Sequence, residues 1–279
     1  MKTKLIKISK ISILAMLVAL MGISGTVYNA EISGSDIAKR EKYNNRSQKQ
    51  VSKAVMVLQS YSGGQWKTLD TRNIYMQSMI WSGSGFNSLT RSISRFMTGL
   101  KKGVTFLSIE VAGGSDDIQY SYVPSLGRPR RVSSSEKQND FEDTDVTNEE
   151  MGSPKIENYT YRRLPDENYR GIPCYVIERF PKDRSIAKYS RHKSWVTKQH
   201  FVPIKVEGYD MEKRLKKKVY ARNIKRFGQI YIPMNLRVIN VQKNTRTLLM
   251  IKDVFVDGQA PVNRSDLQQD RMDATWSIR

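Results

Sequence analysis

Two histidines and one cysteine are the side chains in this sequence that most often do chemistry near neutral pH. His192 and His200 lie eight residues apart, and we expect them on neighbouring strands of one hairpin. No cysteine accompanies them and no acid lies close to them in the sequence, so a zinc site has little support. Cys174 lies in the strand-like run 174–177, which favours a buried, unreactive thiol.

Other motifs of catalysis or ion binding are also missing. The glycine-rich run 82–85 does not match a nucleophile elbow or a phosphate-binding loop. The acidic pairs at 116–117 and 149–150 lack the spacing of a calcium loop. We therefore predict no catalytic residue, no metal site and no cofactor. An enzyme such as a lipid hydrolase is the least favoured alternative, and loss of an envelope activity on replacing His192 or His200 by alanine would support it.

The N-terminus has the pattern of a secretory signal. Residues 1–10 contain four lysines and no acid, and residues 11–23 are apolar apart from Ser12 and Gly22. This apolar run is shorter than the roughly 20 residues that span a bilayer. We predict a signal peptide over residues 1–30, with its boundary between 25 and 30, and one mature domain over 31–279. The expected location is the periplasm, and a retained N-terminal anchor is the alternative.

The chain is strongly basic, with a formal net charge of +20. Removing the four lysines of the signal lowers the charge from +20 to +16. Such a charge favours an anionic partner, for instance an acidic lipid or a membrane surface. Export argues against nucleic acid, and the basic run 213–218 lacks the interleaved aromatic residues of a nucleic-acid site. The simplest interpretation of that run is a strand face with solvated lysines.

Alternating apolar residues predict a mainly β protein. In 229–241, residues Ile230, Ile232, Met234, Leu236 and Val238 share one face, as a half-buried strand requires. A short helix is expected near 35–41, with Ser35 or Asp36 as its N-cap. Ten or more strands with few helices favour a strongly curved antiparallel sheet or partial barrel. The expected strands are 55–58, 74–81, 104–111, 118–123, 159–163, 173–180, 193–197, 201–207, 216–224, 229–241 and 247–256.

An acidic segment, 133–151, interrupts this pattern directly after the arginines Arg128, Arg130 and Arg131. Two interpretations are open: a mobile solvated loop, or a segment that folds back and neutralises the arginines. Thr147 and Glu150 have the spacing of a capping box at a helix start.

Several ordered segments resemble one known family. Residues 116–126 (DDIQYSYVPSL), 127–132 (GRPRRV) and 171–178 (GIPCYVIE) are similar to strands of the outer-membrane lipoprotein-sorting protein family, which has a LolA/LppX-like fold. The resemblance covers most of 54–273. Asp143-Thr144-Asp145 departs from it, because the family has Gly-Ser-Asp there.

The resemblance implies a fold and a function. The implied fold is a strongly curved antiparallel sheet that forms an incomplete barrel, covered by short helices, around an apolar cavity for acyl chains. The implied function is that of a non-catalytic periplasmic carrier or chaperone for a lipid or an acylated lipoprotein. The alternative is an adaptor or accessory subunit of an RND-type envelope transporter that carries no lipid.

Candidate ligand contacts follow from the alternating strands and the basic cluster. Arg130 and Arg131 are the candidates for a lipid head group or for pairing with the acidic segment. The candidates for the apolar cavity are Ile74, Met76, Phe106, Tyr120, Tyr122, Ile232, Met234 and Leu236.

Overall fold

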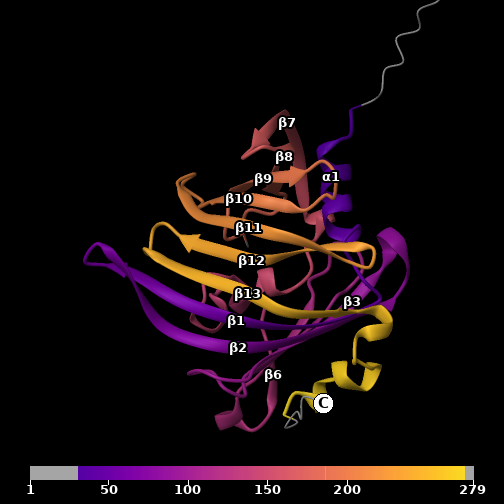
Figure 1. The fold of residues 1–279 in the computed structure, drawn as a ribbon, viewed down its shortest axis with the longest axis vertical. Coiled ribbons are helices and arrows are strands. Elements are labelled where there is room, and N and C mark those ends of the chain that lie inside the picture. The colour runs from indigo at the N-terminus through magenta and orange to yellow at the C-terminus, as the bar shows by residue number, and fades with distance from the viewer. Residues whose placement is uncertain (1–30, 186, 274–279) are drawn as a thin grey trace, which may run out of the picture. The chain divides into compact units, whose positions relative to one another are not determined.

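Thirteen antiparallel strands form a single curved sheet in the computed structural model, which describes residues 31–185 and 187–273 (Figure 1). Each strand pairs with its neighbours in the order β6-β5-β4-β3-β2-β1-β13-β12-β11-β10-β9-β8-β7. The sheet is therefore an open barrel, with β6 and β7 as its two edges. The predicted mainly β fold with an incomplete barrel is confirmed. The predicted signal peptide, 1–30, lies outside the described residues.

Each of the eleven predicted strands has a counterpart in the structure, but β1, β2 and β7 extend well beyond the predicted 55–58, 74–81 and 159–163. The pattern missed β3 and β6, because β3 (LTRSISRF) has few apolar residues and β6 has only three residues. Among the described residues, no helix has both the length and the apolar content that crossing a bilayer requires. The strands are β1 (Lys49–Ser62), β2 (Gln65–Ser82), β3 (Leu89–Phe96), β4 (Thr105–Ile109), β5 (Ile118–Tyr122), β6 (Pro129–Arg131), β7 (Tyr159–Tyr169), β8 (Ile172–Pro181), β9 (Arg191–Thr197), β10 (Pro203–Tyr209), β11 (Leu215–Phe227), β12 (Ile230–Asn240) and β13 (Thr245–Val256).

The segment 132–158, here called the crossing segment, joins the two edge strands and packs on one face of the sheet, which we call the inner face. Its four short 3₁₀ helices are Ser135–Gln138, Phe141–Asp143, Glu149–Met151 and Ile156–Asn158. Its acids contact lysines from several elements. Lys188 and Lys243 both contact Asp140. Of the two interpretations offered for this segment, folding back is correct, but its partners are mainly lysines.

Phe141 of the crossing segment fills the inner face of the β1–β4 half. Its ring lies 5.7 Å from that of Phe96 and 5.1 Å from that of Phe106, measured between centroids. Val132 joins this cluster, and Met151 packs against it. The opposite face of the same strands is covered by the C-terminal residues Val262, Leu267 and Met272. Both faces of this half are therefore closed by the chain itself.

The helix α1 (Gly34–Tyr43) packs against β7 and β8. Ser33 is its N-cap, so the prediction of Ser35 or Asp36 was wrong by two or three residues: the Ser33 Oγ accepts from the Asp36 amide at 3.1 Å. Ile37 and Ala38 are its buried anchors.

We expect Ser33→Ala to lower the free energy of unfolding by about 1 kcal/mol, because one amide of the first turn loses its acceptor. Urea unfolding followed by circular dichroism would measure this. Ser35→Ala is the control and should change less. Equal effects of the two changes would contradict the assignment of the cap.

Candidate functional site

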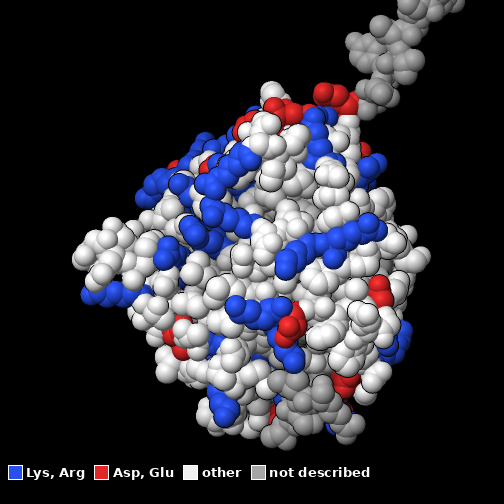
Figure 2. All heavy atoms as spheres, viewed as in Figure 1, with Lys and Arg blue, Asp and Glu red and all other residues white. Residues whose placement is uncertain are grey.

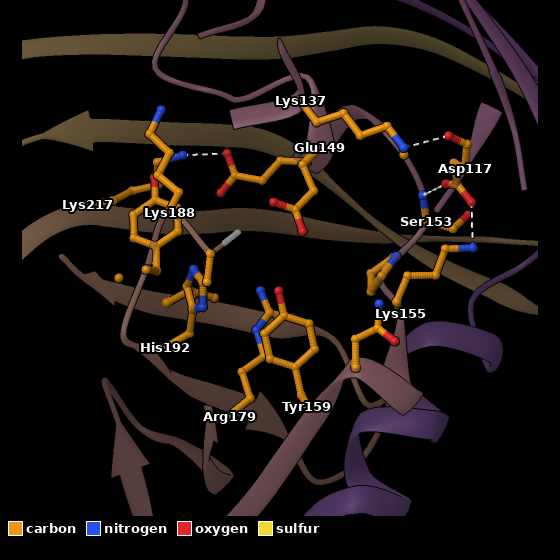
Figure 3. A pocket seen from close by; sticks show the side chains of 18 of the residues that line it. Asp117, Lys137, Glu149, Ser153, Lys155, Tyr159, Arg179, Lys188, His192 and Lys217 are labelled. Carbon is orange, nitrogen blue, oxygen red and sulfur yellow. Dashed lines mark hydrogen bonds and ion pairs between the residues drawn. The ribbon is translucent and has the colours of Figure 1, made fainter. Parts of the chain in front are cut away.

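A central cavity of about 380 Å³ lies between the β7–β11 half of the sheet, α1 and the crossing segment (Figure 3). Its volume falls within the range of small-molecule sites. Five acids and five bases line it, and the remaining lining residues include three tyrosines and two valines. The ten charged residues are Glu41, Asp116, Asp117, Glu149, Glu150, Lys137, Lys155, Lys188, Arg179 and Lys217.

Strand register builds one wall of this cavity as a row across four strands. Arg179 of β8 pairs with His192 of β9, which pairs with Gly208 of β10, which pairs with Lys217 of β11. Directly paired residues in a sheet point to the same face, so all of these positions face the cavity. Gly208 has no side chain, and the Tyr189 ring packs over it: a Cβ there would lie 3.2 Å from that ring and 3.3 Å from His192 Cδ2. We call Arg179, His192 and Lys217 the polar row.

Two positions further along each strand, a second row faces the same way. Ile177 of β8 pairs with Ser194, Ser194 with Val206, and Val206 with Val219. Val206 and Val219 line the central cavity. One wall of the cavity is therefore charged at one level and mostly apolar at the next.

The opposite wall is held together around Asp117 of the β4–β5 connection. Its carboxylate accepts from Lys155 Nζ at 2.6 Å and from the Ser153 amide at 2.7 Å, and its backbone carbonyl accepts from Lys137 Nζ at 2.7 Å. Asp117 is itself buried. These contacts hold the crossing segment against the start of β5. They also pair the charges of Asp117 and Lys155 with each other.

Other charges of the lining are also paired within the protein. Lys217 binds the Glu150 carboxylate, and Lys188 binds Asp140 at 2.8 Å. Within the described residues, no ion pair forms at Arg179 or Glu149. Both nitrogens of His192 and the Nε of Arg179 lack a hydrogen-bond partner there.

The surroundings shift the pKa of several of these groups. Burial raises the pKa of Glu41 despite the opposing charge of Arg179, and burial together with the charge of Glu150 raises that of Glu149. Burial, Arg179 and Lys217 hold the pKa of His192 well below its usual range. His192 is thus neutral at pH 7, with one nitrogen able to donate and the other able to accept.

Two further hollows adjoin the central cavity and share lining residues with it. A hollow of about 270 Å³ on the α1 side shares Glu41, Tyr161 and Arg179. Another of about 610 Å³, toward the loop after β8, shares Glu149 and Tyr159. The central cavity therefore has continuations at both ends.

The apolar residues that the sequence predicted as cavity lining do not line the central cavity. Ile74, Met76 and Phe106 belong to the cluster around Phe141 on the inner face. Tyr120 and Tyr122 pack instead with the C-terminal residues on the opposite face.

Three candidates lie on β12, where Ile232 and Met234 are buried and Leu236 is half-buried. None of the eight apolar candidates is among the residues that line the central cavity. Their role as ligand contacts stays a prediction.

The two candidate arginines lie on β6. Arg130 donates to Glu136 of the crossing segment at 2.7 Å, and Arg131 is exposed. Neither lines the central cavity.

The histidines are not on neighbouring strands, as the sequence had suggested. His192 lies in β9, whereas His200 lies in the turn after β9 and stacks on Tyr231 with ring centroids 3.5 Å apart. Cys174 is buried, as predicted. Across residues 31–185 and 187–273, no group of three or more His, Cys, Asp or Glu side chains lies close enough to hold a metal ion.

Sequence reasoning missed Arg179 and Glu41 as site residues. The signal for Arg179 was present: it alternates with Ile177 and Tyr175 in a strand whose only other charged residue, Glu178, points to the opposite face, so a charge had to share a face with apolar residues. Glu41 offers no such signal, because only the packing of α1 on β7 and β8 brings it to the cavity.

An open antiparallel barrel crossed by a long segment on its inner face is the LolA-like class of fold. A crystal structure of a LolA superfamily protein from Nitrosomonas europaea matches over 86% of this chain and 99% of its own, with a TM-score of 0.62 and 16% identity. A family model described as "Uncharacterized protein" matches residues 89–268, and the chain belongs to that family.

Two solved structures are more similar. A DUF1329 family protein from Desulfovibrio piger has a TM-score of 0.77 and 26% identity, over 86% of this chain and 97% of its own. An outer membrane lipoprotein-sorting protein domain from Vibrio parahaemolyticus has a TM-score of 0.76 and 24% identity, over 86% of this chain and 98% of its own. No individually curated protein matches the sequence. The resemblance to the lipoprotein-sorting family is confirmed.

Proposed function

We propose that the protein is a non-catalytic carrier or chaperone of the periplasm, which holds an amphiphilic lipid or the acylated part of a lipoprotein in its central cavity. The observation that carries this proposal is the two-level wall, in which the polar row lies beside the apolar Val206 and Val219. The LolA-like fold and the secretory pattern of residues 1–30 support it.

The charged lining favours an amphiphilic ligand over a wholly apolar one. A wholly apolar cavity is not confirmed, because five acids and five bases line the hollow. Each methylene that leaves water on the apolar level stabilises binding by about 0.8 kcal/mol. A free alkane would leave the polar row without partners, so a ligand with a polar head and an apolar chain fits both levels.

Lipid extraction followed by mass spectrometry, on protein purified from the cell envelope, tests this proposal. We expect a co-purifying lipid, and uptake of a fluorescent fatty acyl probe by the extracted protein. Val206→Asp places a charge on the apolar level and should reduce probe uptake at least about tenfold. The matched control is Leu69→Glu, which adds a charge at an exposed position of β2. Ligand-free protein that takes up no probe would rule the carrier out.

A second candidate is an adaptor role at an envelope transporter of the RND type. Figure 2 favours a docking surface, because lysine and arginine side chains outnumber acids across the visible face over β9 to β12. Capture of such a transporter by protein that contains no lipid, in detergent-solubilised envelope, would favour this role over the carrier.

A further inference from the structure

We infer that Arg179, His192 and Lys217 form a binding site for a phosphate group, and that this phosphate belongs to the head group of the lipid that the central cavity receives. The inference rests on the proposed carrier function and adds the chemical class of the ligand. The three side chains come from β8, β9 and β11 and line the same cavity, with the Lys217 ammonium directed toward Glu150 (Figure 3). The Tyr189 ring lies over Gly208, with its centroid 4.6 Å from that of His192.

Arg179 is the centre of this site. Its guanidinium lies 5.4 Å from the centroid of the Tyr159 ring, which holds the cation in place without neutralising it. No ion pair forms at Arg179 within the described residues, and its Nε has no hydrogen-bond partner there. A guanidinium keeps its charge at any relevant pH and matches two phosphate oxygens at once. The charges of Glu41 and Glu150 act on Arg179 without a direct ion pair among the described residues, and a bound phosphate would supply that direct partner.

His192 adds a second, independent observation. The side chain belongs to a residue that is only 6% exposed, lines the cavity, and has no hydrogen-bond partner at either ring nitrogen among the described residues. Buried polar groups are nearly always hydrogen-bonded in native proteins, so two free nitrogens on one wall mark a place where a ligand donates or accepts. A phosphate oxygen accepts from the N–H of this ring, and a protonated phosphate or a glycerol hydroxyl donates to the other nitrogen.

Lys217 supplies the second positive charge. It lies 5.3 Å from the centroid of the Tyr189 ring and is bound to Glu150. A lysine has three donors, so one contact with Glu150 leaves others for a phosphate.

Two acids of the cavity, Glu41 and Glu149, also lack an ion pair among the described residues. Burial raises the pKa of both, so each takes up a proton more readily than an exposed glutamate does when an anion binds beside it, whereas the charge of Arg179 is fixed.

Nuclear magnetic resonance of the two histidine rings tests the site directly in the full mature protein. A phosphate beside the polar row stabilises the imidazolium, so we expect it to raise the pKa of His192 by at least about one unit. His200, on the outer turn, is the internal control and should not change. The three probes are inorganic phosphate, a short-chain phosphatidic acid, and the diacylglycerol with the same chains, which has no phosphate.

Variants separate the role of Arg179 from that of charge in general. We expect Arg179→Gln to weaken phosphatidic acid binding at least about tenfold and to leave diacylglycerol binding unchanged. Arg179→Lys keeps the positive charge but cannot bind two phosphate oxygens in parallel as a guanidinium does. It is the variant to test if Arg179→Gln does not fold. The matched control is Arg162→Gln, an exposed arginine of the neighbouring strand that faces Glu178 on the opposite side of the sheet.

The outcomes distinguish this inference from the carrier function. Equal binding of phosphatidic acid and diacylglycerol, unaffected by Arg179→Gln, would overturn the phosphate site and leave the carrier intact. Binding of inorganic phosphate that raises the pKa of His192, with no binding of either lipid, would support the site and overturn the carrier. No response of His192 to any probe would overturn the site whatever the lipid result.

Discussion

Phe141→Ala is expected to lower the free energy of unfolding by about 3–5 kcal/mol, because it opens a cavity among side chains that cannot collapse onto one another. Phe141 is 2% exposed and contacts the rings of Phe96 and Phe106. For a chain of this size, the change corresponds to a fall in Tm of about 6–20 °C. Urea or thermal unfolding of the protein measures it.

The control for this change is Phe86→Ala, since Phe86 is 55% exposed and its removal should cost less than about 1 kcal/mol. An unfolding midpoint that does not move in Phe141→Ala would show that the crossing segment is not part of the cooperative core. The inner face of β1–β4 would then be open to a ligand, and Ile74 and Phe106 would regain their predicted role.

Glu110→Ala is expected to cost about 3–5 kcal/mol at pH 7, because it leaves buried cations without their counter-charge. Glu110 follows β4 and accepts from Lys42 Nζ at 2.9 Å and from Arg46 at 3.1 Å. Both cations belong to the end of α1 and the residues after it, while the Thr90 amide of β3 donates to the same carboxylate at 3.0 Å. One carboxylate thus holds α1 against the sheet at the α1-side hollow, which Lys42 and Arg46 line.

The same site predicts a pH dependence. Burial alone would raise the pKa of Glu110, but the hydrogen bond from Lys42 and the charge of Arg46 lower it to about 2. Because the carboxyl has a lower pKa in the folded state, its contribution is fully present above its ordinary value of 4.5 and is lost as the pH falls toward 2.

We expect Glu110→Gln to show a shallower loss of stability between pH 4.5 and 2 than the unchanged protein. Urea midpoints at several pH values across this range give the comparison. Glu212→Ala is the control, since Glu212 pairs with Arg214 at the exposed surface and should contribute little. Parallel curves for the unchanged protein and Glu110→Gln would contradict the low pKa.

The proposed carrier function implies a route by which an amphiphile would enter the central cavity. Glu149, Tyr159 and Asn158 line both the central cavity and the hollow toward the loop after β8. That hollow lies between the crossing segment and the edge strand β7, where no further strand closes the barrel. An amphiphile that enters there meets charged residues first and the apolar level of β10 and β11 last.

Much of the fold could be predicted from the sequence because strand patterns are local. The alternation from Ile230 to Val238 needs only neighbouring residues, and β12 buries these positions as expected, with Leu236 half-buried. Thr147 and Glu150 likewise form the predicted reciprocal bonds, since three residues of spacing bring their atoms together in a tight turn. The pattern did not predict β3, because Ser92, Ser94 and two arginines leave this strand with few apolar residues.

The sequence by itself determined the class of the fold, the family resemblance and the polar character of the crossing segment, because these depend on local periodicity and on the order of the strands. Only the tertiary structure decided that Phe141 fills one half of the inner face, and that Arg179, His192 and Lys217 meet in the other half. The reason is physical: positions that pair across strands are many residues apart, so their meeting depends on the register and curvature of the sheet.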